Sequence, residues 1–278
     1  MYKGNRSLKI LTILLIVAFL FAMIFPFLWV FITSFKTTGE IYSPTGAFNI
    51  IPDNPTTKNY VSVLFEKGIL NAVKNSFIVS SVTTIYIIFV ATLCAYAISR
   101  FHFRGKNVLL GLILAVSMFP QMIVTGPVYN LFNELGLTNS FAIVLPYSVI
   151  TLPTAVWILV THFNQIPLAI EESAKMDGAS PFQILYRIVF PLAAPGVFTT
   201  AIIVFIAAWN EFLLTITLNA DQAYHTVPVA ISFLRTQFEI LWGEVTAATT
   251  IVTIPTLIIV LLFQKQIVSG LTSGGVKE

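Results

Sequence analysis

The strongest concentration of charge in the sequence is a short stretch, EESAKMDGASPFQ, between residues 171 and 183. Glu171, Glu172, Lys175 and Asp177 fall within seven residues of a 278-residue chain in which only 10% of residues are charged. The stretch has the pattern of two short helices joined at Gly178, and long apolar runs lie on both sides of it. So polar and sharply turned a segment predicts a rigid surface that lies outside an apolar environment.

Other kinds of chemistry have little support in the sequence. His102, His162 and His225 are far apart, and the single cysteine, Cys94, lies in an apolar run, which indicates a small buried side chain. The phosphate-binding pattern G-x-x-x-x-G-K-[ST] is absent, as are H-E-x-x-H and G-x-S-x-G. We expect no catalytic residue, no metal site and no cofactor bound by this chain, so that any energy source belongs to another chain.

Apolar residues dominate the remainder of the chain. Hydrophobic residues make up 56% of it and the mean hydropathy is +0.87, whereas soluble domains carry about 25% charged residues. Several apolar runs exceed the roughly 18 residues that indicate a membrane-spanning helix. We predict an all-α membrane protein, a bundle of six transmembrane helices with a polar helix–turn–helix loop. The spans are expected at about 10–34, 72–98, 108–131, 140–163, 192–217 and 246–267.

Basic residues predict the orientation and argue against nucleic acid as a partner. The net charge is only +3, and lysine and arginine are scattered between the apolar runs. With both termini in the cytoplasm, ten basic residues lie inside and five outside, which is the distribution that the positive-inside rule favours. The charged stretch then faces the cytoplasm. The five basic residues outside are Lys36, Lys58, Lys67, Lys74 and Arg235.

Polar and helix-breaking residues refine this outline. Residues 37–70 are rich in proline, glycine, asparagine and threonine and predict an outer cap of short amphipathic pieces. The segment 264–278 is too polar and glycine-rich to continue the sixth helix, and it predicts a tail. Proline frees backbone groups in a membrane helix, so we expect interruptions in three spans. The interrupting residues are Pro120, Gly126, Pro127, Pro146, Pro153 and Pro255.

The second span carries a stripe of small residues at four-residue spacing, which predicts close packing against other helices. The stripe consists of Ser76, Ser80, Thr84, Ala91 and Ala95.

Local signals define both halves of the charged stretch. Pro167 suits the start of the first helix, and Gly178 suits the position after its end, where positive φ is common. Ser180, Pro181 and Gln183 then form an S-x-x-Q capping box that opens the second helix. The sequence predicts two short helices that meet at a sharp glycine turn and form a rigid unit outside the membrane, and an ordinary interfacial loop is an equal alternative. We call residues 164–191 the knob.

The knob resembles a known family signature. Glu172, Ser173 and Ala174 are followed after three residues by Gly178, and after nine more by IVFP, residues 188–191. The "EAA" signature of binding-protein-dependent ABC importer permeases has the pattern E-A-A-x3-G-x9-I-x-L-P. Ser173 and Phe190 depart from it, and the spacing is intact. The stretches ISRFHFRGK, WNEF, TVPVAISF and GLTSGGVKE also look like the maltose-type carbohydrate subfamily.

The resemblance implies a single permease domain over residues 1–278, in which the knob couples the chain to ATP hydrolysis. It implies a second homologous permease, two cytoplasmic ATPase subunits that carry ATP and Mg, an external sugar-binding protein, and a location in the prokaryotic inner membrane. The solute would be a di- or oligosaccharide, with α-glucosides favoured on subfamily resemblance alone. Tail contacts with the ATPases would involve Ser273, Gly274 and Gly275. The ATPase-coupling residues would be Glu171, Glu172, Ser173, Ala174, Asp177, Gly178, Ile188 and Pro191.

Trp209, Asn210 and Glu211 are candidates for the substrate pathway near the outer end of the fifth span. An acid in hydrocarbon costs roughly 2.5–3.5 kcal/mol, so Glu211 is expected to face a cavity or a partner. Trp209 would stack on a sugar ring and Asn210 would supply hydrogen bonds. An interfacial tryptophan anchor with a solvated glutamate is an equal alternative.

Other functions remain as alternatives. The main one is a permease for a different solute, such as glycerol phosphate or a polyol. An ion-coupled secondary transporter would need paired carboxylates within the membrane, and only Glu211 lies near a span. A membrane-embedded hydrolase would need one of the missing motifs.

Overall fold

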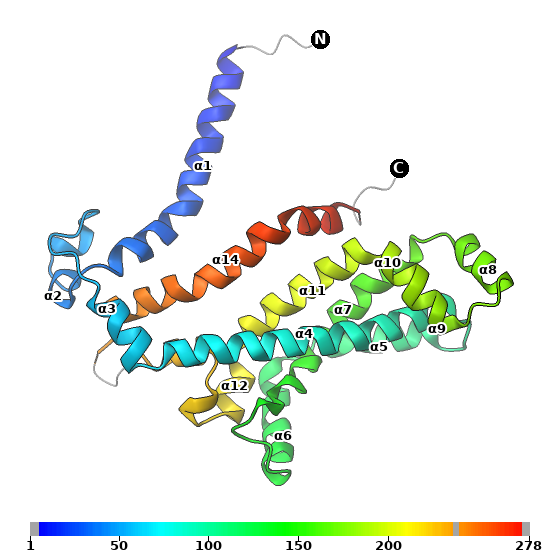
Figure 1. Ribbon diagram of the computed structural model, residues 1–278. Coiled ribbons are helices and arrows are strands. Elements are labelled where there is room, and N and C mark those ends of the chain that lie inside the picture. The colour runs from blue at the N-terminus through cyan, green and yellow to red at the C-terminus, as the bar shows by residue number, and fades with distance from the viewer. Residues whose placement is uncertain (1–5, 236–238, 274–278) are drawn as a thin grey trace. The chain divides into compact units, whose positions relative to one another are not determined.

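A computed structural model describes residues 6–235 and 239–273, and over these residues the chain is helical (Figure 1). Their single β-type pairing is an isolated bridge between Arg235 and Ile240. The all-α prediction is therefore confirmed. The chain divides into two compact units. The first comprises the described residues up to Leu70 together with Ile231–Ile254, and the second comprises Asn71–Ala230 and the described residues from Pro255.

The first unit joins one long apolar helix to a group of short ones, as the sequence predicts for residues 37–70. A buried charge fixes this group, because Lys36 is fully buried and donates hydrogen bonds to the carbonyls of Gly46 and Ala47 at 3.1 and 2.9 Å. The Lys36 ammonium also lies 4.9 Å from the centre of the Trp29 ring. The helices that begin here are α1 (Arg6–Thr33), α2 (Thr38–Ile41), η1 (Gly46–Phe48), α3 (Lys58–Val61), η2 (Ser62–Glu66) and α14 (Trp242–Ser273).

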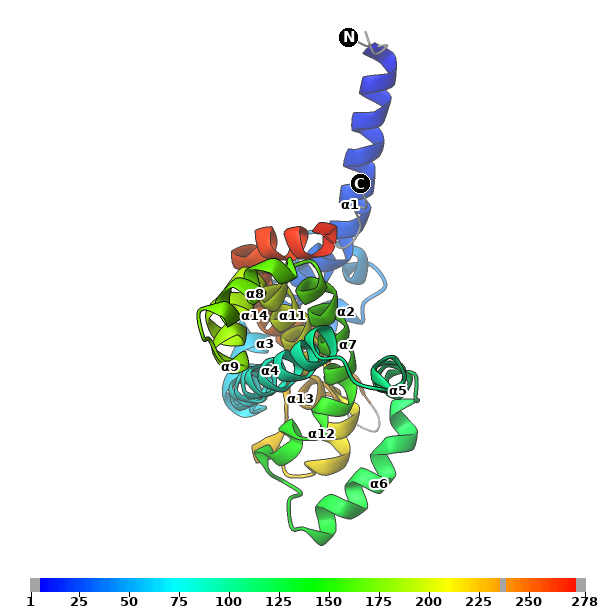
Figure 2. The same cartoon turned by 90° about the vertical axis from the view of Figure 1, so that its right-hand side faces the viewer.

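The second unit packs long helices against one another. In it, α7 contacts both α5 and α11, and α6 contacts α12. Figures 1 and 2 show the knob helices α8 and α9 together at one end of this unit. The helices are α4 (Ile69–Arg100), α5 (Lys106–Ser117), α6 (Gln121–Glu134), η3 (Phe141–Val144), α7 (Tyr147–Asn164), α8 (Leu168–Met176), α9 (Pro181–Ile184), η4 (Leu185–Val189), α10 (Phe190–Leu192), α11 (Ala194–Trp209), α12 (Leu213–Leu218), η5 (Gln222–Tyr224) and α13 (Val227–Ser232).

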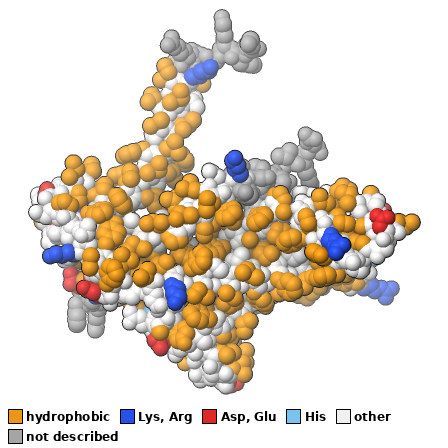
Figure 3. Space-filling view, in the orientation of Figure 1, with side chains coloured by type: hydrophobic (Ala, Val, Ile, Leu, Met, Phe, Trp, Pro, Cys, Tyr) orange, Lys and Arg blue, Asp and Glu red, His pale blue; other side chains and the backbone are white. Residues whose placement is uncertain are grey.

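Four stretches of helix are long and apolar enough to cross a membrane: Leu8–Thr33, Ile69–Arg100, Phe141–Asn164 and Trp242–Lys265. Two bent pairs bring the number to six if each counts as one span. Side chains of these helices expose much hydrophobic surface, which Figure 3 shows on the face that it presents. Lipid accommodates such a surface and water does not, so the chain is a polytopic membrane protein.

Proline interrupts the helices at only some of the predicted positions. The third predicted span bends by 92° between α5 and α6, at Pro120, and Pro146 lies directly before α7. The interruptions predicted at Pro127, Pro153 and Pro255 are absent, because these residues lie inside α6, α7 and α14. A membrane helix tolerates proline where the freed carbonyl finds another partner or adjusts locally.

Two predicted helix ends also differ from the structure. The span predicted at 192–217 is two helices, because α11 ends at Trp209 and α12 begins at Leu213. The sixth helix does not stop near Gln264, since α14 continues to Ser273. Gln264, Lys265 and the two residues that follow have good or fair helix propensity, and a single glycine in the last turns costs only about 1 kcal/mol relative to alanine.

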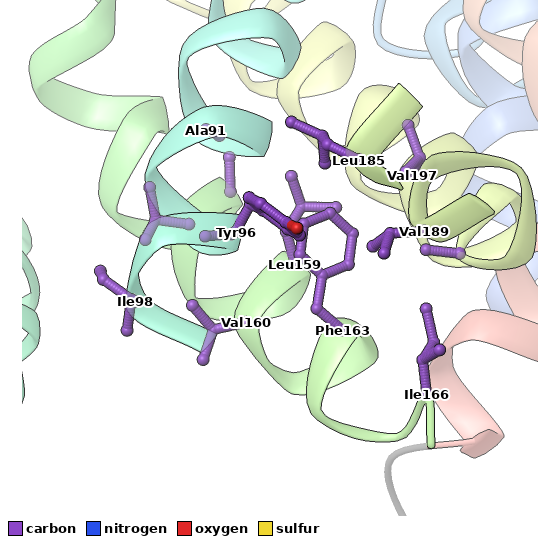
Figure 4. Close-up of a cluster of buried hydrophobic side chains, with 14 of the residues drawn as sticks. Ala91, Tyr96, Ile98, Leu159, Val160, Phe163, Ile166, Leu185, Val189 and Val197 are labelled. Atoms are coloured by element: carbon purple, nitrogen blue, oxygen red, sulfur yellow. The ribbon is translucent and has the colours of Figure 1, made fainter. Parts of the chain in front are cut away.

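The small-residue stripe of α4 lies in the main core of the second unit. Ala91 and Ala95 are fully buried and share a cluster with Leu159 and Phe163 of α7, as Figure 4 shows for most of these side chains. Side chains this small let the two helices approach closely. The predicted packing role is thus confirmed for Ala91 and Ala95. In a membrane this close contact, rather than escape from water, provides the attraction between helices.

Candidate coupling loop and pathway site

The first half of the knob folds as its sequence predicts. Helix α8 follows Pro167 and ends at Met176, Asp177 is its C-cap, and Gly178 has φ +79°. The amide of Gly178 donates to the carbonyl of Lys175 at 3.0 Å, and the amide of Ala179 donates to that of Ala174 at 3.0 Å. These bonds satisfy the carbonyls at the helix end, and they require the left-handed residue that glycine provides.

The second half begins with the predicted capping box. The Ser180 hydroxyl accepts from the amide of Gln183 at 3.3 Å, and the Gln183 side chain accepts from the amide of Ser180 at 2.8 Å. Ile184, Leu185 and Val189 then point into the core of the second unit, where Figure 4 shows Leu185 and Val189 near residues of α4 and α7. The inner side of α9 and η4 therefore fixes the knob to the bundle.

The outer side of the knob is exposed and carries most of its charge. Met176, the last residue of α8, is 90% exposed. Ser173 bonds its own helix through the Ala169 carbonyl at 2.9 Å. Of the residues predicted to couple to an ATPase, Ala174 and Ile188 are half-buried. The exposed ones are Glu172, Ser173, Asp177, Gly178 and Pro191.

Glu171 differs from all of these because its side chain is 1% exposed. Its Oε1 accepts from the Nε of Arg100, the last residue of α4, at 2.5 Å. The same guanidinium donates through Nη2 to the carbonyls of Phe163 at 2.7 Å and Ile166 at 3.4 Å. Glu171 is therefore paired inside the chain, and of the residues predicted to couple to an ATPase it is the one whose side chain is buried in an ion pair.

No local pattern predicts the buried position of Arg100, which the sequence indicates only as one of the ten basic residues on the cytoplasmic side. Its guanidinium lies at the C-terminal end of α7, where a cation interacts favourably with the helix dipole and with unpaired carbonyls. Tyr96, one turn earlier on α4, also interacts electrostatically with Glu171 and Arg100. The arrangement joins α4, α7 and α8 at a single buried ion pair.

The three candidate pathway residues, Trp209, Asn210 and Glu211, have different surroundings in the structure, as Glu171 and Glu172 do. Glu211 is 6% exposed, and its carboxylate accepts from the amides of Leu214 and Thr215 at 2.7 and 3.2 Å and from the Thr215 hydroxyl at 3.2 Å. A fourth bond at 3.2 Å comes from the side chain of Gln121, at the start of α6. The carboxylate thus caps the first turn of α12. The alternative of a solvated glutamate does not describe this structure.

Trp209 and Asn210 do not join Glu211 in this network. The Trp209 ring is 4% exposed and stacks on Phe205 with ring centres 5.8 Å apart, while Asn210 bonds the Ile206 carbonyl of its own helix. A cavity of about 170 Å³ lies instead beside Gln121, at the break between α5 and α6. Its lining is mostly apolar and includes Ser117, Phe119, Gln121, Val128, Pro146 and Leu214.

Other predicted features lie at or beyond the limits of the structure. Ser273 is the last described residue of α14, and Gly274 and Gly275 fall outside the described residues. Within the part of the chain that the structure describes, no three His, Cys, Asp or Glu side chains are grouped so as to hold a metal ion.

Comparison with known proteins places this geometry in a wider context. Residues 87–273 match the family described as "Binding-protein-dependent transport system inner membrane component". The chain is 40% identical to the trehalose/maltose transport system permease protein MalG of Thermococcus litoralis, over 95% of this chain and 96% of that one. It is 37% identical to the sulfoquinovosyl glycerol transport system permease protein SmoH of Agrobacterium fabrum, over 91% and 89%.

The fold also matches a solved structure. A chain from the crystal structure of a bacterial ABC transporter involved in the import of the acidic polysaccharide alginate superimposes with a TM-score of 0.77. The match covers 95% of this chain and 98% of that one at 20% identity, and it concerns the fold alone.

Proposed function

The chain belongs to the family of binding-protein-dependent transport system inner membrane components, and from that premise we propose that it is the permease subunit of an ATP-driven sugar importer. The knob is the observation that carries this proposal. It is a rigid helix–glycine–helix unit with a buried inner side and a charged outer side, and it lies at one end of a polytopic bundle. Such a unit suits the transmission of movement from a partner to the membrane helices.

The solute in this proposal is a di- or oligosaccharide, with an α-glucoside as the favoured class. Trehalose and maltose, which name one relative, are both α-linked diglucosides. The second relative is named for a different glycoside, so similarity supports the sugar class more strongly than any single sugar. The pathway in this proposal passes the cavity that Gln121 lines and where Gln121 bonds Glu211. Trp209 would reach a sugar only after leaving its stack on Phe205.

The assembly in this proposal contains two permeases and two ATPases. This chain pairs with a second homologous permease, an extracytoplasmic binding protein delivers the sugar, and two cytoplasmic ATPase subunits bind ATP and Mg²⁺. The chain lies in the prokaryotic inner membrane with both termini in the cytoplasm, as the excess of basic residues on that side favours. The tail from Ser273 onward would thread between the ATPase subunits.

Movement of the knob drives transport in this mechanism. Closure of the ATPases on ATP displaces the exposed side of α8, and the buried side carries the displacement into the bundle. The helices then alternate between outward-facing and inward-facing arrangements, as rigid bodies hinged at their breaks. The second unit hinges in this mechanism at its helix interruptions, which include the 92° bend at Pro120, the 81° bend at Ala193 and the break between Trp209 and Leu213.

Reconstitution tests the whole proposal. The permease pair and its ATPases would be placed in lipid vesicles, with maltose or trehalose and the cognate binding protein outside. We expect ATP hydrolysis inside the vesicles to rise when the sugar-loaded binding protein is added, together with accumulation of labelled sugar. Sugar added without the binding protein is the control, because ATP hydrolysis in a binding-protein-dependent system rises only with the sugar-loaded binding protein. Uptake that depends on a proton or sodium gradient, and not on ATP, would refute the proposal.

A further inference from the structure

Two adjacent glutamates of α8 face in opposite directions. Glu171 is 1% exposed and bonded to Arg100, whereas Glu172 is exposed. A carboxylate at either position has the same intrinsic chemistry, so their surroundings give them different tasks. The exposed one is available to another chain, and the buried one acts inside this chain.

The buried ion pair is anchored on three elements. Arg100 ends α4, Phe163 and Ile166 lie at and just beyond the end of α7, and Glu171 lies in the first turn of α8. The side chain of Arg100 is 6% exposed, and its planar guanidinium, carried by α4, bonds at once to the end of α7 and to α8. Because arginine carries several donors in a fixed fork, it holds its partners in one relative geometry, which a lysine cannot reproduce.

Burial makes this pair intolerant of partial loss. A buried charge that loses its partner is left without water or a counter-ion, and breaking such a pair is far more disruptive than replacing both members. Arg100 donates the hydrogen bond that the structure describes at Glu171 Oε1, and Tyr96 is the other polar side chain that interacts with this carboxylate. The connection between α8 and the ends of α4 and α7 therefore depends on both Arg100 and Glu171.

We propose that Arg100 is a positioning residue for energy coupling, which acts through Glu171 to make α8 move together with the ends of α4 and α7. The proposal rests on the proposed function, in that the knob receives movement from an ATPase. It adds the route by which this movement enters the bundle. Without the pair, α9 and η4 still attach the knob through apolar contacts, but α8 swings independently of α4.

Coupling is measured as ATP hydrolysed per sugar transported, in the reconstituted complex. We expect Arg100→Gln and Glu171→Gln each to raise this ratio by roughly two- to thirty-fold, the range that single residues produce when they modulate coupling between sites. The double variant should be no worse than either single variant, because both remove the same interaction. Arg104→Gln is the matched control, since Arg104 is an exposed arginine four residues further on, and it should leave the ratio unchanged.

The ratio separates positioning from folding, because it does not depend on how much protein reaches the membrane. A purely structural pair would lower abundance, uptake and hydrolysis together at a constant ratio, and that result would overturn the proposal. Arg100→Lys and Glu171→Asp keep both charges and serve where the neutral variants are too scarce to assay. A wild-type ratio of ATP hydrolysed to sugar transported in Arg100→Lys and Glu171→Asp would also overturn the proposal.

Limited proteolysis tests the positioning without any transport assay. Lys175 is exposed on α8, so trypsin cleavage after it in the purified permease pair, without the ATPases that would cover α8, reports how firmly the helix is held. Cleavage should be faster in Arg100→Gln than in wild type or Arg104→Gln, and an unchanged rate would contradict the proposal. If the wild-type complex shows no ATP-dependent uptake, the proposed function fails, whereas the cleavage rates still decide whether the pair positions α8.

Discussion

Gln121 and Glu211 join two interrupted helices, since the side-chain amide of Gln121 donates to the carboxylate of Glu211 at 3.2 Å. Gln121 begins α6 directly after the bend at Pro120, and Glu211 lies in the gap between α11 and α12. Helices α6 and α12 also pack against each other. The buried carboxylate of Glu211 thus connects the break between α11 and α12 to the bend before α6, so a movement at one of these interruptions displaces the other.

Removing this carboxylate should destabilise the protein and impair transport. In Glu211→Ala the amides of Leu214 and Thr215 lose their acceptor, and each buried unsatisfied group costs about 1–3 kcal/mol. Glu211→Gln keeps one acceptor oxygen and should be milder. Melting temperature in detergent and sugar uptake in vesicles measure both effects. Equal melting temperatures for wild type and Glu211→Ala would show that the cap contributes nothing.

Substitution at Gly178 should uncouple the knob through its backbone alone. A Cβ atom added there meets no atom within 4 Å, so the φ of +79° is what opposes a residue other than glycine. The left-handed conformation costs roughly 1–2 kcal/mol for a residue with a Cβ and more for a β-branched one. Gly178→Val should therefore lose ATPase co-purification and uptake while it still inserts in the membrane. Gly178→Asn is the control, because asparagine tolerates positive φ, and equal defects in both variants would point away from backbone geometry.

The orientation of the chain can be read by cysteine labelling in intact cells. In a Cys94→Ser background, a cysteine at 58 should react with an impermeant reagent, and one at 104 should react only after the cells are permeabilised. Both native residues, Lys58 and Arg104, are exposed in the structure, so poor accessibility within the fold would not explain a negative result. The reverse labelling pattern would invert the topology.

The end of the chain should contribute to assembly with the ATPases. Deletion of residues 271–278 removes the last residues of α14 together with the segment beyond Ser273. We expect weaker ATPase co-purification and lower uptake from this variant. Deletion of 276–278, which spares Gly274 and Gly275, is a milder comparison. If both truncated chains transport at the wild-type rate, the tail has no coupling role.

Acid should destabilise the region around His225. Burial lowers the pKa of His225 below its ordinary value near 6.5, although the carbonyl of Ala220 and the charge of Asp221 oppose the shift. The unfolded chain then binds more protons than the folded one just below that value, so stability falls as pH falls through it. Melting temperature should drop between about pH 7 and pH 5.5, and the drop should be smaller in His225→Asn. An identical drop in both proteins would assign the pH dependence to other groups.

Local signals made much of the knob predictable. The glycine turn, the capping box and the helix boundaries depend on residues within four positions of one another, and backbone sterics and hydrogen bonding decide them. The apolar runs likewise indicated where helices cross the membrane, because length and composition suffice for that inference.

Contacts between distant segments were not predictable in the same way. Arg100 and Glu171 are 71 positions apart, and nothing local distinguishes the buried Glu171 from the exposed Glu172. The break after Trp209 was missed because Asn210 and Glu211 were interpreted as pathway residues inside a span, whereas the Glu211 carboxylate accepts from the amides of the next helix and caps it. Proline gave the opposite error, a predicted interruption where the helix continues, because Pro127, Pro153 and Pro255 lie inside continuous helices.

The opposite directions of Glu171 and Glu172 also have an evolutionary consequence. Arg100 and Glu171 are encoded by one gene, so a horizontal transfer of that gene moves both members of the pair together, and compensating changes can accumulate within it. Glu172 faces a surface that another gene would specify. We therefore expect Glu171 to covary with Arg100 among homologues, whereas variation at Glu172 should follow the ancestry of the ATPase. A permease recruited to a foreign ATPase would keep its internal pairing and adapt first at the outward residue.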